Sequence, residues 1–255
     1  MKSYFISHGA PDIIFEISEY TDIIKEIGKL NKQPKAIVVV SAHYESHTQK
    51  IGGAHPYKTI YDFYGFQDEL YDVKTNYSAD LILADKIISL LEINGVKSVL
   101  DSNRGIDHGA WCVLKLMYPE TKIPVITMSI DIALPLEKQY EIGKIIGQLK
   151  DEEILILCSG GIVHNLGTVD LGSEDIDEWA LNFQEWIKLR VDNWNHEEIF
   201  HYKNKAPQWE LAVPREEHFI PFIIAMGTGD KKRKGKYLAE KIQYKNLSLD
   251  LIEFE

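Results

Sequence analysis

Four strand-length runs of apolar residues constrain the fold of this chain more than any other feature of its sequence. They cover residues 4–6, 35–42, 124–128 and 154–158, and the last three are apolar in continuous rather than alternating order. A strand that is apolar on both sides is buried on both faces, as in a parallel sheet covered by helices. The sequence therefore predicts an α/β fold with a central, largely parallel or mixed sheet.

Helical patterns separate these runs. Ser78 is expected to cap a helix that ends at Gly95, and residues 136–149 and 173–200 repeat apolar side chains at helical spacing. Residues 248–254 alternate and predict an edge strand. Since no Pro- or Ser-rich linker divides the chain, we predict one layered domain over residues 1–255, with helices flanking the sheet.

Charge and composition exclude several classes of function. The chain holds 28 Lys and Arg against 39 Asp and Glu, a net charge of −11, which argues against a nucleic-acid partner. The apolar runs fall far short of the roughly 20 residues of a membrane span, and no signal-peptide core is present, so a cytoplasmic protein without membrane contact is expected. The basic run at 231–236 is expected to be a solvated loop, with a specific anion site as the alternative.

Histidines placed after predicted strands point to a metal site. His8, His43 and His164 each follow one of the buried runs. Ligands of open α/β sheets bind beyond the carboxyl ends of the strands, so three imidazoles are expected to converge there. His108 lies where a loop enters a helix that Asp107 is expected to cap. Imidazoles without thiolates suit Zn(II) or Fe(II).

The remaining histidines divide into two kinds. His218 follows two glutamates, and His55 opens an aromatic-rich segment that runs to Phe66. The other three lie in polar stretches and are expected to take no part in the site: His47, His196 and His201. No HExxH, GxSxG, Walker or GxGxxG motif is present, so the common zinc-peptidase, serine-hydrolase and nucleotide-binding arrangements are absent from the sequence.

Seven short motifs follow one another along residues 1–227: SHGAP at 7–11, SAH at 41–43, HP at 55–56 with TIYDFYGF at 59–66, DHG at 107–109, MSID at 128–131, HNL at 164–166 and EH at 217–218. In this order they resemble the class III extradiol ring-cleavage dioxygenases, in the branch similar to DOPA dioxygenases. The resemblance implies a single α/β domain, a non-haem metal at one end of the sheet, and cleavage of a catechol ring beside its hydroxyls with O2.

The resemblance also implies roles for individual histidines. His8 and His43 match the two metal-binding histidines of the family. His164 matches a histidine that is the catalytic base in the protocatechuate-cleaving branch and a metal ligand in the DOPA-type branch. His108 matches a histidine that contacts substrate or oxygen, and His218 falls where the protocatechuate branch has a glutamate ligand.

Two questions about the site stay open at this point. Either Glu217 or His218 completes the metal site, and we favour His218 because Glu217 would face another side of a helix. The metal is Fe(II) or Zn(II), one per chain. His55 and Tyr61 are expected to line the substrate pocket, and Arg104, Lys58 or Arg215 is available to pair with a substrate carboxylate.

The leading hypothesis is an extradiol dioxygenase that uses O2 to open a small, DOPA-like catechol to a yellow muconic-semialdehyde-type product. In it His164 moves protons and His108 stabilises developing negative charge. One alternative is a zinc-dependent hydrolase of a small amide or ester at the same histidines. Another is a non-catalytic binding protein with a structural metal. The oligomeric state is left undetermined.

Overall fold

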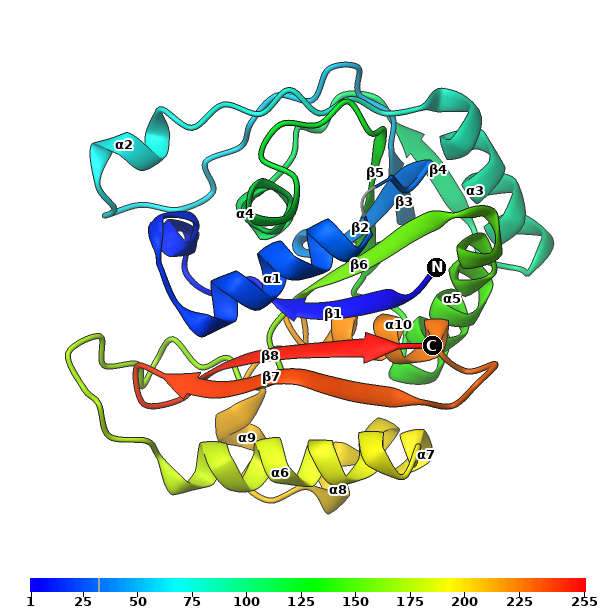
Figure 1. Ribbon diagram of the computed structural model, residues 1–255. Coiled ribbons are helices and arrows are strands. Elements are labelled where there is room, and N and C mark those ends of the chain that lie inside the picture. The colour runs from blue at the N-terminus through cyan, green and yellow to red at the C-terminus, as the bar shows by residue number, and fades with distance from the viewer. Residues whose placement is uncertain (32) are drawn as a thin grey trace.

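The computed structural model describes residues 1–31 and 33–255. A mixed sheet forms its centre, and the strand order is β4-β3-β5-β2-β6-β1-β8-β7 (Figure 1). The strands are β1 (Ser3–Ser7), β2 (Ala36–Ser46), β3 (Gln49–Gly52), β4 (Ser98–Asp101), β5 (Val125–Asp131), β6 (Ile154–Gly160), β7 (Gly235–Gln243) and β8 (Leu247–Phe254). The helices are α1 (Glu19–Leu30), α2 (Asp68–Tyr71), α3 (Leu81–Ile93), α4 (His108–Met117), α5 (Leu136–Gly147), α6 (Glu178–Asp192), α7 (His196–Phe200), α8 (Tyr202–Lys205), α9 (Trp209–Ala212) and α10 (Ile220–Thr228), with 3-10 turns η1 (Pro11–Phe15) and η2 (Gln148–Glu152).

The predicted α/β fold is confirmed. Strands β5, β2, β6 and β1 run parallel to one another, while β8 pairs antiparallel with β1 and β3 pairs antiparallel with β5. Every residue of β1, β5 and β6 is buried, as their continuous apolar sequences require. Helices α1 and α4 pack together on one face of the sheet, α5 and α10 pack on the other, and α6 contacts β7 and β8 (Figure 1).

Helix caps explain where two helices begin. Asp107 caps α4 as predicted, because its side chain accepts a hydrogen bond from the backbone of Ala110. The cap predicted for α3 was wrong by two positions: Asp80, not Ser78, accepts from the first turn, through Ile82 N at 2.9 Å and Leu83 N at 3.2 Å. No helix within the described ranges combines the length and apolar character that crossing a bilayer requires.

The C-terminal strand differs from its predicted place at the sheet edge. Strand β8 lies between β1 and β7, and β7 takes the edge position. All residues of β7 except Ile242 are exposed or half-buried, so its sequence is rich in charged residues. This composition hides the strand from a search for apolar runs. The basic run at 231–236 therefore ends inside β7, whose first residue is Gly235.

A carboxyl group buried between β8 and α6 makes the stability of the fold depend on pH. Asp250 in β8 is fully buried and accepts a hydrogen bond from Gln184 Nε2 at 2.7 Å. Burial raises the pKa of Asp250 to about 7, although hydrogen bonds from Ser248 and Gln184 oppose this rise. Because the folded pKa lies above the unfolded value, ionising Asp250 costs stability as the pH rises from about 4 to about 7.

We therefore expect Asp250→Asn to gain stability relative to the wild type as the pH rises. The difference in unfolding free energy between the two proteins should grow by up to about 4 kcal/mol across that window and stay constant above it. Urea unfolding at pH 5 and at pH 8 measures it. A difference that is the same at both pH values would contradict a neutral Asp250 in the folded protein.

Candidate active site

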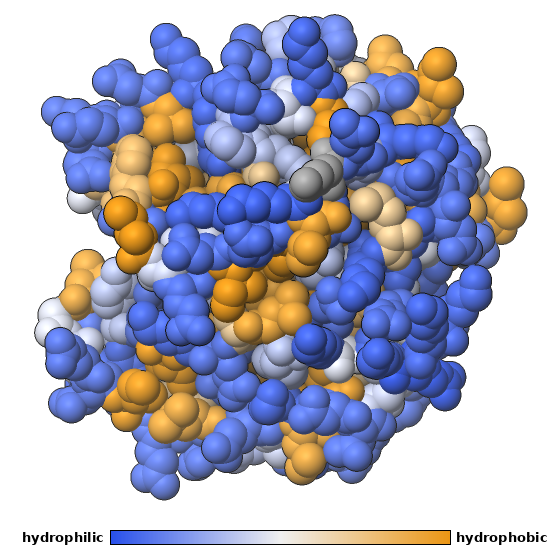
Figure 2. All heavy atoms as spheres, viewed as in Figure 1, coloured by the Kyte–Doolittle hydropathy of each residue, from blue (hydrophilic) through white to orange (hydrophobic). Residues whose placement is uncertain are grey.

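A cavity of about 510 Å³ lies beyond the carboxyl ends of the parallel strands. His8 directly follows β1, His43 lies near the end of β2, and His164 comes four residues after the end of β6. His108 opens α4 and His218 precedes α10, and all five histidines line the cavity. Figure 2 shows the molecule indented at its left edge, the side toward which β1 runs, with hydrophobic residues on both sides of the indentation.

The five imidazole rings form one cluster. The ring centroids of His8 and His43 are 5.0 Å apart, and those of His43 and His108 are 4.1 Å apart. His218 lies 5.2 Å from His8 and 4.9 Å from His43, and His164 stacks on His218 at 3.6 Å. Candidate ligand atoms form two separate sets, and within each set all atoms lie within 4.8 Å of one another. The first set comes from His8, His43 and His108, and the second from His164, Glu217 and His218.

Hydrogen bonds fix the ring orientation of His8 and His43. Ser159 Oγ donates to the carbonyl of Gly109 at 2.5 Å, so it accepts from His8 Nδ1 at 2.9 Å. Asp62 accepts from His43 Nδ1 at 3.2 Å. Both rings therefore carry their proton on Nδ1, and their Nε2 atoms face each other 3.1 Å apart with free lone pairs. This is the arrangement found at histidines that bind a metal, where an acceptor holds the second ring nitrogen.

Carboxylates orient two further rings. Asp62 also accepts from His108 Nδ1 at 2.8 Å and from the His108 backbone at 3.1 Å, and Glu217 accepts from His218 Nδ1 at 3.2 Å. Among the residues that the structure describes, the ring of His164 has no hydrogen-bond partner. His164 thus differs from the other four rings, because both of its nitrogens stay free for a ligand.

Burial controls the protonation of the cluster. It lowers the pKa of His8 and His218 well below the ordinary imidazole value, and it lowers the pKa of His164 to about 4. Burial alone would raise the pKa of Asp62, but hydrogen bonds from His108 and His43 outweigh it and hold that pKa well below its usual range. At neutral pH His8, His164 and His218 are therefore neutral imidazoles, and Asp62 is ionised.

Two glycines allow backbone segments to approach the cluster. A Cβ at Gly109 would come within 2.8 Å of Ser41 Oγ and 3.0 Å of a His43 ring carbon. A Cβ at Gly160 would come within 2.3 Å of the carbonyl of His218. Glycine at these positions lets the start of α4 and the segment before α10 pack against the ends of the strands.

The structure does not bring His55 or Tyr61 to the cavity. His55 is exposed, borders a separate depression and contacts the carbonyl of Ala79 through Nδ1 at 3.3 Å. The hydroxyl of Tyr61 donates to the carbonyl of Val73 at 2.7 Å, so its ring is held outside the lining. The lining of this segment comes instead from residues 62, 63, 64 and 66.

The three basic residues suggested for a substrate carboxylate also lie outside the cavity lining. Arg104 Nη2 donates to the carbonyl of His43 at 2.8 Å and to Asp107 at 3.1 Å. Arg215 pairs with Glu45 at 2.8 Å, and Lys58 is exposed. Arg104 instead supports the backbone that carries His43.

Asp62 and Ser159 are the residues of the site that sequence reasoning missed. Asp62 lies inside the motif TIYDFYGF, and Ser159 ends the apolar run of β6. The one available signal was a carboxylate in an otherwise aromatic segment. Its partners, His43 and His108, lie 19 and 46 residues away in the sequence, so their contact appears only in the folded chain.

Known proteins resemble this chain over nearly its whole length. The family model described as the catalytic LigB subunit of aromatic ring-opening dioxygenase matches residues 4–249. A protein of Beta vulgaris named 4,5-DOPA dioxygenase extradiol is 38% identical over 93% of this chain and 90% of its own length. An Escherichia coli K12 protein of the same name is 32% identical over 98% of this chain and 93% of its own.

A solved structure agrees with these sequence relatives. The crystal structure of an uncharacterized protein from Escherichia coli K12 superposes with a TM-score of 0.83 at 28% identity, covering all of both chains. The family match, the relatives and the histidine cluster at the ends of the strands lead to one conclusion. The chain belongs to the LigB family of extradiol aromatic ring-opening dioxygenases.

Proposed function

We propose that this protein opens the ring of a DOPA-like catechol with O2, using one Fe(II) ion held by His8, His43 and His218. The observation that carries the proposal is the pair of Nε2 atoms of His8 and His43, 3.1 Å apart with both Nδ1 protons already engaged. Two nitrogen ligands at about 2.1 Å from one ion lie about 3 Å apart when their bonds meet at a right angle. The two rings therefore fit a single ion.

His218 is proposed as the third ligand on the basis of its orientation. Its Nδ1 faces Glu217, and its ring lies about equally far from His8 and His43. Glu217 acts here as the acceptor that orients His218, as carboxylates do for metal-bound histidines. We propose Fe(II) rather than Zn(II) because zinc has no redox chemistry with which to use O2. When bound, the iron would supply Lewis acidity toward the catechol oxygens and electrons for O2.

His164 is proposed to accept a proton from a catechol hydroxyl. Its ring lines the cavity and is unprotonated at neutral pH, since burial lowers its pKa to about 4. A general base must lie near the proton it removes and be in its basic form, and His164 meets both conditions. Returning this proton later in the reaction restores the free imidazole.

His108 and Asp62 form a second proton-handling pair. Because Asp62 holds the proton on Nδ1 of His108, Nε2 presents a lone pair that accepts a hydrogen bond from the substrate. If Nε2 takes a proton, the adjacent carboxylate stabilises the imidazolium, as an aspartate does for a catalytic histidine in hydrolases. The protonated ring then donates a hydrogen bond to an oxygen that gains negative charge.

We expect Asp62→Asn to lower kcat/KM by about 10- to 100-fold, because Asp62 orients both His43 and His108. As a positioning residue it should also change the pH profile of kcat, since an amide cannot stabilise a His108 imidazolium. Asp68→Asn, an exposed change in α2, is the matched control. A pH profile identical to that of the wild type would mean that Asp62 has only a structural role.

The lining of the cavity indicates which catechols it accepts. Apolar side chains, among them Phe63, Phe66, Leu166 and Leu247, form most of its wall, and its charged lining residues other than histidines are Asp62 and Glu217. Within the described part of the chain, no Lys or Arg borders it. A carboxylate attached directly to the ring would be buried without a cationic partner, at a cost of several kcal/mol.

A catechol panel tests the proposed function. The protein is reconstituted anaerobically with Fe(II) and supplied with O2 and catechol, 4-methylcatechol, dopamine, DOPA or protocatechuate. We expect O2 uptake equal to the yellow ring-opened product, with protocatechuate at least about tenfold lower in kcat/KM than DOPA. The zinc-loaded protein is the control and should consume no O2. If no catechol is opened by protein shown to hold iron, the proposed function is wrong.

A further inference from the structure

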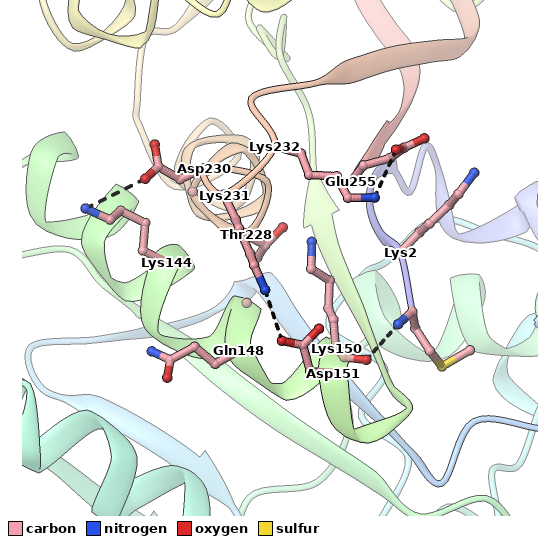
Figure 3. A pocket seen from close by; sticks show the side chains of 13 residues that line it. Lys2, Lys144, Gln148, Lys150, Asp151, Thr228, Asp230, Lys231, Lys232 and Glu255 are labelled. Atoms are coloured by element: carbon pink, nitrogen blue, oxygen red, sulfur yellow. Dashed lines mark hydrogen bonds and ion pairs between the residues drawn. The ribbon is translucent and has the colours of Figure 1, made fainter.

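A second cavity lies at the opposite end of the sheet from the histidines, where both chain termini are found (Figure 1). Its volume is about 510 Å³, and among the described residues five lysines and three carboxylates border it: Lys2, Lys144, Lys150, Lys231 and Lys232, with Asp151, Asp230 and Glu255 (Figure 3). We refer to it as the lysine cavity. Such a gathering of cations is notable in a chain whose net charge is −11. Neither the family match nor the mechanism above uses it.

Lys150 differs from the other four lysines. Its side chain is nine-tenths buried, and Figure 3 shows its ammonium group pointing into the middle of the cavity. Among the residues described by the structure, this group makes no hydrogen bond and no ion pair, whereas Lys231 pairs with Asp151 at 3.4 Å and Lys232 pairs with Glu255 at 3.3 Å. Burial lowers the pKa of Lys150 to about 8, because the charged form of the group is disfavoured away from water.

The helices that end at the cavity explain the lysines only in part. Cations are favoured at helix C-termini, and α5 and α10 end at Gly147 and Thr228 on the cavity wall. The helix dipole favours a cation at these ends even without a hydrogen bond, whereas direct capping requires the ammonium of Lys150 to bond one of the free carbonyls there. Within residues 1–31 and 33–255 it bonds none, so the group is left available for a ligand.

Lys231 and Lys232 are able to turn toward such a ligand. Their side chains are 84% and 64% exposed, and exposed ion pairs such as theirs contribute little stability. Together with the ammonium of Lys150 they offer cationic donors on more than one side of the cavity. We infer that the lysine cavity binds a small phosphate-class anion, with Lys150 as its buried anchor.

Pyrophosphate binding tests this inference without reference to ring cleavage. Isothermal titration calorimetry at pH 7 and low ionic strength is carried out on the metal-loaded protein with inorganic phosphate and with pyrophosphate. We expect saturable binding of one pyrophosphate per chain, weakened about tenfold or more by Lys150→Met, which keeps the apolar stem and removes the charge. Lys97→Met is the matched control, because Lys97 is an exposed lysine directly before the edge strand β4. This variant should bind as the wild type does.

Two further arms make the result specific to this cavity. The double variant Lys231→Gln/Lys232→Gln alters only exposed side chains and should also weaken binding, which guards against a folding defect in Lys150→Met. His43→Ala should bind pyrophosphate normally, because its position is in the other cavity. Unaltered binding by both lysine variants, loss of binding in His43→Ala, or no saturable binding to the wild type would each overturn the inference.

Discussion

Replacing His8 by alanine is expected to remove the bound metal and to lower the ring-cleavage rate by about 10³-fold or more. His8 is 3% exposed, and Ser159 fixes its ring so that Nε2 faces His43. A Lewis-acidic ion contributes several kcal/mol to such a reaction, and each 1.36 kcal/mol corresponds to a factor of ten in rate. Metal content by elemental analysis and the rate of yellow product formation measure the two effects.

The same measurements decide which histidine is the third ligand. If His218 binds the metal, His218→Ala should lose it while His108→Ala retains it and loses activity only. The opposite pattern would assign the third position to His108, whose ligand atom lies within 4.8 Å of those of His8 and His43. His201→Ala changes an exposed histidine that does not line the cavity and should keep both metal and activity. Full metal content in His8→Ala would contradict the proposed ligand set.

Replacing His164 by alanine is expected to lower kcat by about 10²- to 10⁴-fold while leaving the metal in place. This range is typical for the loss of a general base. His164 stacks on His218 but has no hydrogen-bond partner for its ring among the described residues, so its removal leaves the proposed ligands with their own acceptors. Single-turnover kinetics with DOPA, together with the metal content, separate the loss of a base from the loss of a ligand.

An outcome in which His164→Ala loses its metal would contradict the assignment of His164 as a base and favour a ligand role instead. His164→Gln provides a second test, because glutamine retains hydrogen-bonding capacity but does not take up a proton. If His164→Gln turns over at the wild-type rate, proton transfer by this residue is excluded. His201→Ala again serves as the control.

Much of the fold was predictable because it rests on local patterns. The continuous apolar runs of β2, β5 and β6 required burial on both faces, and Asp107 began α4 where a capping residue was expected. The two errors, the cap of α3 and the position of β8, arose where one sequence pattern fits two structures. Both Ser78 and Asp80 are good caps, and the alternation of β8 fits an inner strand as well as an edge strand once β7 covers it.

The candidate site also contains residues that local patterns could place and residues that they could not. His8, His43 and His164 were placed together from their positions after strands, because parallel strands end at one edge of the sheet. His55 and Tyr61 were not predictable in this way, since side chains of an irregular segment point wherever its hydrogen bonds direct them. Tyr61 is held by Val73, and the neighbouring Asp62 enters the cavity instead.

By itself the sequence determined the class of fold and the end of the sheet where histidines gather, and its seven ordered motifs resemble one family. The first two follow from periodicity and from chain order, which are properties of short segments. Only the tertiary structure decided that Asp62 orients His43 and His108, that the ring of His164 has no hydrogen-bond partner among the described residues, and that Lys150 is buried facing an open cavity. Hydrogen bonding and burial depend on residues brought together from distant parts of the chain, so no local pattern encodes them.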